Sequence, residues 1–186
     1  MLLTKILLNM RNSIKLNDIM KLQLLKKLSS KDIIEIWKSK NNEKIYSTVM
    51  NSEKYMKIKT NSKICKNFII PIKFNENYYN IFLQFNEKII LFTSLDYIQK
   101  FGIKNTNPII YMTFYDELVK THDLILLRTN ILNNHLNKLQ VINLIENTLK
   151  FYLDFNLFQW VKLFNLNPKQ FNYKQYLNQN KHIFNI

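Results

Sequence analysis

Three apolar runs lie close together in the middle of this 186-residue chain, and they constrain its fold more than any other feature. They cover residues 68–74, 78–85 and 88–92, and only two or three polar residues separate one run from the next. β-branched and aromatic side chains fill them, while Pro71, which has no amide hydrogen, favours an edge strand. Links this short cannot hold a parallel crossover, so the sequence predicts an antiparallel meander of three strands.

The next part of the chain alternates between helix and strand signals. Thr93 or Ser94 is placed to cap a short helix, and Gly102, the only glycine, would end it with a positive φ. Beyond this helix the pattern predicts a strand at residues 109–113, a short helix carrying residues 116–119 and a strand at residues 123–128.

Amphipathic helices are predicted before and after these strands. Ser29 and Asp32 have the spacing of a capping box, and the helix that they open should place Ile33, Ile34, Ile36 and Trp37 on one broad face. A second helix is predicted after residue 42, with Ile45, Val49 and Met56 inward. A long helix is predicted over residues 136–155, with Leu139, Ile142, Leu144 or Ile145, Leu149 and Tyr152 inward.

These elements together predict an α+β fold: a mainly antiparallel, twisted sheet with helices packed against it, and N-terminal helices preceding the sheet. A chain of this length can bury roughly 70% of the surface that its unfolded form exposes, so it needs no metal or disulfide to hold a core. We expect residues 18–186 to form a single domain.

Residues 1–17 differ from the rest in charge. They contain three basic residues and hydroxyl groups but no acid, which is typical of an organellar targeting segment. The alternative is an N-terminal helix of the domain, because a helical period continues through Ile19, Leu22 and Leu25. No apolar run approaches the roughly 18 residues that a membrane span requires.

A net charge of +14 would attract any anionic partner, including RNA. Lysines alternate with aromatic residues, and a sheet that exposes aromatic rings can stack RNA bases, so an RNA-binding or ribosome-associated organellar protein is the alternative function. Against it, no Lys/Arg-Gly-Phe arrangement is present, and lysine is plentiful throughout the chain.

Catalytic signals are weak. The three histidines, His122, His135 and His182, are scattered, a single glycine rules out a glycine-rich phosphate loop, and Cys65 alone can form neither an internal disulfide nor a thiolate cage. We therefore expect no enzymatic activity, cofactor, metal or small-molecule substrate.

Seven short blocks occur in an order and spacing that resemble the mitochondrial ATP synthase assembly factor family. The similarity covers roughly residues 31–176, and the blocks are residues 34–37, 68–72, 84 with 91–97, 114–118, 124–128, 151–152, and 164–165 before Pro168. The chain departs from the family in three places. Ser39-Lys40-Asn41-Asn42 stands where members usually have Tyr-His, Thr129 replaces a glycine after Arg128, and Asn75 or Asn77 replaces a glycine of the meander.

This resemblance implies a monomeric, non-enzymatic α+β domain in the mitochondrial matrix, which makes residues 1–17 a candidate mitochondrial targeting segment. The implied partner is the unassembled β subunit of the ATP synthase catalytic sector, held until the α subunit displaces the assembly factor. A nucleic acid partner is not expected, and neither is a membrane span.

Six residues are candidates for contact with such a partner. Phe114, Tyr115 and Glu117 would form an aromatic knob with an acidic rim, or else the first turn of a helix with Phe114 packed inward. Trp37 could lie in the core or at the contact. Tyr78 and Phe82 lie on the second face of the middle meander strand and become contacts if helices cover only one side of the sheet.

Overall fold

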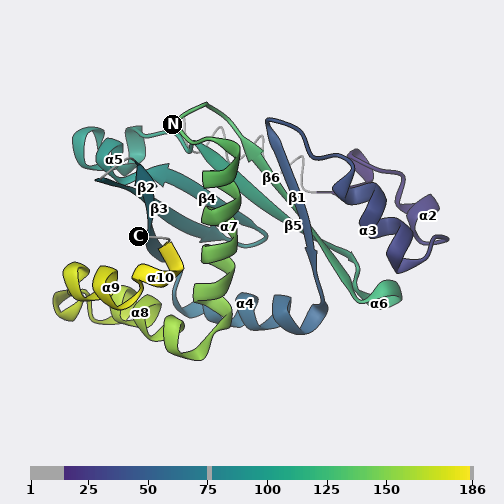
Figure 1. Ribbon diagram of the computed structural model, residues 1–186. Helices are drawn as coiled ribbons and strands as arrows, with labels where there is room; N and C mark the ends of the chain where they lie inside the picture. The colour runs from purple at the N-terminus through teal and green to yellow at the C-terminus, as the bar shows by residue number, and fades with distance from the viewer. Residues whose placement is uncertain (1–14, 75–76, 185–186) are drawn as a thin grey trace.

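The computed structural model describes residues 15–74 and 77–184 and shows one six-stranded antiparallel sheet with helices around it (Figure 1). The strands are β1 (Ile45–Met50), β2 (Asn67–Phe74), β3 (Asn77–Asn86), β4 (Ile89–Ser94), β5 (Ile110–Leu118) and β6 (Leu124–Ile131). The helices are η1 (Leu16–Asp18), α2 (Leu22–Leu25), α3 (Ser30–Lys38), α4 (Ser52–Ile64), α5 (Leu95–Phe101), η2 (Ile103–Asn105), α6 (Val119–His122), α7 (Lys138–Leu153), α8 (Phe155–Leu166), η3 (Pro168–Gln170), α9 (Tyr173–Gln179) and α10 (Lys181–Phe184). This arrangement confirms the predicted α+β fold.

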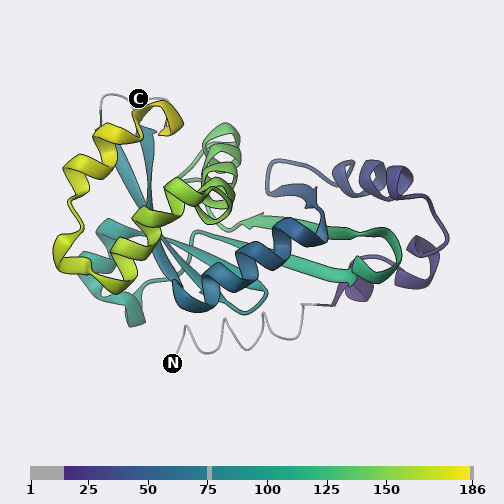
Figure 2. The same cartoon turned by 90° about the horizontal axis from the view of Figure 1, so that it is seen from below.

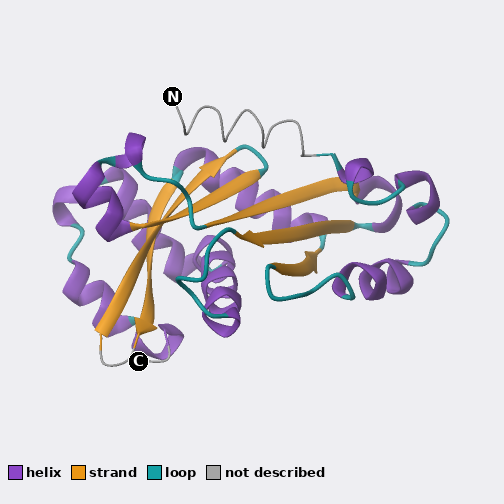
Figure 3. Ribbon diagram, turned by 90° about the horizontal axis from the view of Figure 1, so that it is seen from above, coloured by secondary structure: helices purple, strands orange, loops and turns teal. Residues whose placement is uncertain are grey.

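The strand order β1-β6-β5-β4-β3-β2 places β1 and β2 at opposite edges. Helix α4 joins these two edge strands and runs below the sheet in Figure 1. From β2 the chain returns strand by strand to β6, which pairs with β1. The predicted meander is confirmed as β2-β3-β4, with Pro71 on an edge strand, where a missing donor costs least. Figure 3 shows the strong twist that carries the strands near β2 steeply across those near β1.

The main core lies between the sheet and α4, α7 and α8, and Figure 2 shows α7 standing on one side of the strands. Strand β3 contributes Ile81, Leu83 and Phe85 to this core, because alternate side chains of a strand point to the same face. Helix α7 covers them with a buried stripe that includes Leu144, Ile145, Phe151 and Tyr152. The predicted inward residue Leu139 is instead 66% exposed.

A smaller core lies at the β1-β6-β5 end, where α2 and α3 pack. Tyr115 and Leu126 are register partners and face this core, while their neighbours Phe114 and Leu127 face the main core. The Trp37 indole extends from α3 into this smaller core. Its Nε1–H donates to the carbonyls of Leu127 (3.0 Å) and Thr48 (3.2 Å). These strands are thus covered on both faces.

The C-terminal tail of the chain, residues 155–184, is rich in aromatic side chains and packs against strand β2. Tyr176 is fully buried, lies 5.5 Å from the Phe68 ring centroid, and donates its hydroxyl to the Ile69 carbonyl. Asn165 of α8 hydrogen-bonds with both the amide and the carbonyl of Asn67. Side chains of the tail therefore occupy hydrogen-bonding groups along the β2 edge.

Two capping predictions are confirmed. Ser29 caps α3 by accepting a hydrogen bond from the Asp32 amide, although its hydroxyl also binds the Asp32 carboxylate, which does not reach back to the Ser29 amide as a full capping box would. Ser94, rather than Thr93, caps α5, and Gly102 follows that helix with a φ of 77°.

Two helix predictions are wrong. Residues 45–50 form strand β1 because they pair with β6, and the helix that follows turns Tyr55 and Ile58 inward while Met56 is 54% exposed. Residues 116–118 continue β5, so α6 begins only at Val119. The long helix predicted over residues 136–155 is confirmed as α7, which spans Lys138–Leu153. Asp154 ends α7 and caps α8, a helix that was not predicted.

The first seventeen residues fall into two parts. Residues 1–14 lie outside the described residues, as does most of the turn predicted at residues 75–77. Leu16 is fully buried in the smaller core beside Ile33 and Trp37. The end of the candidate targeting segment is thus packed into the domain.

Candidate functional site

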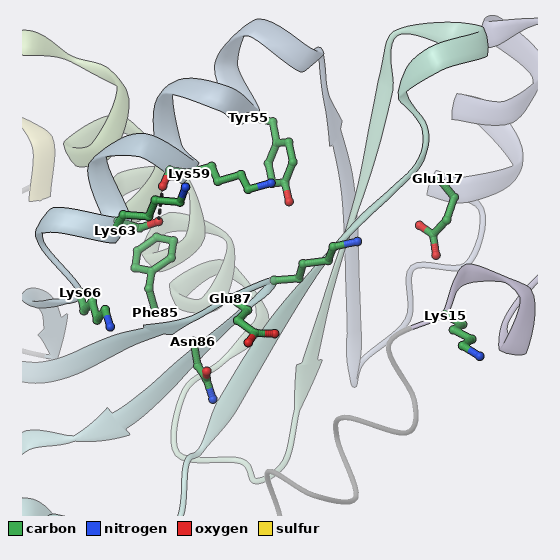
Figure 4. Close-up of a pocket in the computed structure, with 11 residues that line it drawn as sticks. Lys15, Tyr55, Lys59, Lys63, Lys66, Phe85, Asn86, Glu87 and Glu117 are labelled. Atoms are coloured by element: carbon green, nitrogen blue, oxygen red, sulfur yellow. Dashed lines mark hydrogen bonds between the residues drawn. The ribbon is translucent and has the colours of Figure 1, made fainter.

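A cavity of about 790 Å³ opens between α4 and the turn that joins β3 to β4 (Figure 4). Helix α4 and the residues just after it supply Lys59, Lys63 and Lys66, and the turn supplies Lys88. Lys15 lies on the opposite side, next to Glu117. We call this cavity, with its five lysines, the lysine pocket.

Local structure explains how α4 presents its lysines. The side chain of Asn51 caps the helix by accepting from the Lys54 amide, and Tyr55 and Ile58 anchor its inner face in the main core. Lys59 and Lys63 are four residues apart, so they lie one above the other on the same helical face. That face borders the cavity.

The opposite wall comes from the β3–β4 turn and the end of β5. Glu87 adopts a φ of 54°, which allows a two-residue connection between the strands. Lys88 forms an ion pair with Asp116 at 2.5 Å, and Asp116 lies 3.5 Å from the Tyr55 hydroxyl. Burial, together with the negative charge of Asp116, raises the pKa of Tyr55 to about 12, so this phenol is neutral at physiological pH.

Glu117 links the pocket wall to the N-terminal segment. Its Oε1 accepts a hydrogen bond from the Leu16 amide at 2.9 Å. Its Oε2 is buried and finds no hydrogen-bond partner among the described residues. The Glu117 carboxylate therefore fixes the chain at Lys15–Leu16 beside the pocket.

The lysine pocket has an excess of positive charge, with five lysines and two glutamates in its wall. Lys88–Asp116 is the one salt bridge within residues 15–74 and 77–184, so Lys59, Lys63 and Lys66 have no carboxylate partner there. Phe85 provides an apolar wall, but its ring is mostly buried and lies 4.5 Å from the Tyr152 ring centroid. The pocket thus offers ammonium groups without carboxylate partners over an apolar base, and one of them, Lys59 Nζ, lies 5.9 Å from the Tyr55 ring centroid.

The six predicted contact residues divide into two groups. Trp37, Phe114 and Tyr115 are only 0%, 1% and 3% exposed, so they are core residues of this structure, and the predicted knob does not form. Neither does the alternative helical turn, because this segment lies in β5. Tyr78, Phe82 and Glu117 are half-buried, and only Glu117 borders the pocket.

The lysines of the pocket were missed by sequence reasoning. The spacing of Lys59, Lys63 and Lys66 is a helical signal, but the predicted helix was centred upstream of them. Lysine is also so common in this chain that three more at helical spacing do not stand out.

Within the described ranges, no group of three or more His, Cys, Asp and Glu side chains is arranged to hold a metal ion. No helix there is both long enough and apolar enough to cross a membrane. Cys65 is buried, and burial raises the pKa of its thiol. The ring of His122 hydrogen-bonds with the Leu28 carbonyl and the Thr121 hydroxyl, which accounts for both of its nitrogens.

An α+β scaffold with a charged pocket over an apolar base provides a surface through which a protein can bind a partner or ligand. A family model described as "ATP11 protein" matches residues 9–177. The chain therefore belongs to the mitochondrial ATP synthase assembly factor family, whose members are assembly chaperones and not enzymes. No curated protein sequence matches the chain.

Proposed function

We propose that this ATP synthase assembly factor acts in the mitochondrial matrix on the β subunit of the catalytic sector. It binds the unassembled subunit and prevents its aggregation until the α subunit takes its place. The observation that carries the proposal is the family match, which extends over residues 9–177.

Physical reasoning supports a chaperone with such a client. A subunit that will bury a large apolar surface in a ring exposes that surface before assembly, and exposed patches of this kind aggregate. A chaperone need only cover the patch reversibly. If its affinity is below that of the final subunit contact, assembly proceeds by mass action.

The packing of Leu16 bears on the targeting segment. Because Leu16 fills the smaller core and its amide binds Glu117, any processing of the chain on import would have to cut before Lys15. We therefore expect the mature protein to keep Leu16, which N-terminal sequencing of the organellar form would test.

Affinity capture from mitochondrial extract tests the proposed client. The tagged protein should retain free β subunit, and added α subunit should release it. As a matched control, an unrelated tagged protein of similar net charge should retain none. Capture of nucleic acid without any ATP synthase subunit would overturn the proposal.

A further inference from the structure

We propose that the lysine pocket binds an acidic polypeptide segment of the client. This inference rests on the proposed function, because it names the surface through which the assembly factor meets the unassembled subunit. It concerns the pocket wall formed by α4, and not the core aromatic residues.

The first argument is charge. Lys59, Lys63 and Lys66 are exposed and have no carboxylate partner among the described residues, whereas the charge of Lys88 is offset by Asp116. Lys59 and Lys63 are like charges four residues apart on one helix, an arrangement that destabilises the helix. Carboxylates from a ligand would relieve this repulsion, so acidic groups are the complementary chemistry.

The second argument is the distribution of these charges. Figure 4 shows Lys59, Lys63 and Lys66 along one side of the cavity and Lys15 on the far side, beside Glu117. The ammonium groups do not converge on one point, as they would around a single phosphate. Spread along the cavity, they match several carboxylates of an extended segment.

The third argument separates polypeptide from RNA. A single-stranded nucleic acid needs aromatic faces on which its bases can stack. The rings in this wall are occupied, since Phe85 lies against Tyr152 and Tyr55 lies 5.4 Å from Phe114. Apolar side chains of a peptide, in contrast, need only contact with the apolar base.

A matched pair of variants on one helix tests the inference. K59Q/K63Q removes two charges that line the pocket, while K54Q/K57Q removes two exposed charges of the same helix that do not. All four side chains are exposed, so both variants should melt within a degree or two of the parent protein. The probes are a fluorescein-labelled peptide of repeated Glu-Glu-Leu, its Gln-Gln-Leu counterpart and labelled single-stranded RNA.

The acidic peptide should bind the parent protein and K54Q/K57Q alike, and K59Q/K63Q about tenfold more weakly. Added salt should weaken binding to the parent protein, and the neutral peptide should bind poorly. Equal loss of affinity in both variants, equal binding of the neutral peptide, or RNA binding that depends on Lys59 and Lys63 would overturn the inference.

Capture of the β subunit with the same variants separates the two proposals. If the parent protein and K59Q/K63Q retain the subunit equally, the pocket assignment fails while the proposed function stands. If the parent protein retains no β subunit at all, the proposed function fails, and the peptide assay alone decides whether the pocket takes acidic segments.

Discussion

Trp37 connects helix α3 to the sheet through one side chain. Its ring is fully buried between α3 and the Tyr115 ring, with centroids 5.8 Å apart, and its indole nitrogen donates to two strand carbonyls. From the sequence alone, this residue could have been core or contact, because a lone tryptophan on an apolar face fits both. The structure assigns it to the core.

Replacing Trp37 with Phe should keep most of the apolar contact but leave the carbonyls of Thr48 and Leu127 without the indole donor. We expect a loss of about 1–3 kcal/mol in the free energy of unfolding, measured by urea denaturation. Glu35→Ala, on the exposed side of the same helix, should change it by less than about 0.5 kcal/mol. Equal effects of the two substitutions would refute this role of the indole.

Buried tyrosines make the stability of the protein sensitive to alkaline pH. Burial raises the pKa of Tyr55 and Tyr115 to about 12, and raises those of Tyr152 and Tyr176 well above the ordinary value of 10. Below pH 10 these phenols are neutral in both states, so they favour neither. Between pH 10 and 12 the unfolded chain ionises and the folded protein does not, so the free energy of unfolding falls as pH rises.

This effect can be followed by absorbance at 295 nm. Part of the tyrosine signal should appear only above pH 12 or together with unfolding, and the urea midpoint should decline from pH 10 upward. If every tyrosine of the folded protein titrates near pH 10, the burial described above is wrong.

At the scale of elements, Asp154 separates helix α7 from helix α8. Its Oδ1 accepts hydrogen bonds from the amides of Asn156 and Leu157, both at 2.9 Å, and this starts α8 in a new direction. The sequence pattern predicted an end of the first helix at about residue 155 but no second helix after it. The capping residue at this position was the available signal.

Asp154→Ala should therefore cost about 1 kcal/mol of stability, since two amides of α8 lose their acceptor. Asp154→Ser keeps a capping oxygen without the charge and should recover most of the loss. Thermal melting of the parent protein and the two variants measures these differences in stability. No difference between Ala and the parent would show that the cap contributes nothing.

Strand β1 shows why other elements could not be predicted. The side chains of residues 45–49 suit both a helix with Ile45 and Val49 inward and a β-branched strand. Pairing with β6, about eighty residues away in the chain, decides between them. The meander was predictable because its links are local. The lysine pocket was not, because it joins α4, a distant turn and Lys15.

At the scale of the whole molecule, both outer edges of the sheet are occupied. The side chain of Asn41 binds the amide and carbonyl of Ser47 in β1, and Lys138 reaches the Ile45 carbonyl. Along β2, the Tyr176 hydroxyl donates to the Ile69 carbonyl and the Asn165 amide group donates to the Asn67 carbonyl. These contacts leave little room for a client to add a strand, so we expect binding through side chains on a preformed surface.

In the proposed function, the protein shields the unassembled β subunit by reversible contact. The direct measurement is light scattering of purified β subunit diluted from denaturant, with and without an equal amount of this protein. We expect the protein to suppress scattering and to keep the subunit available for assembly when α subunit is added. Unchanged scattering in the presence of the folded protein would contradict it.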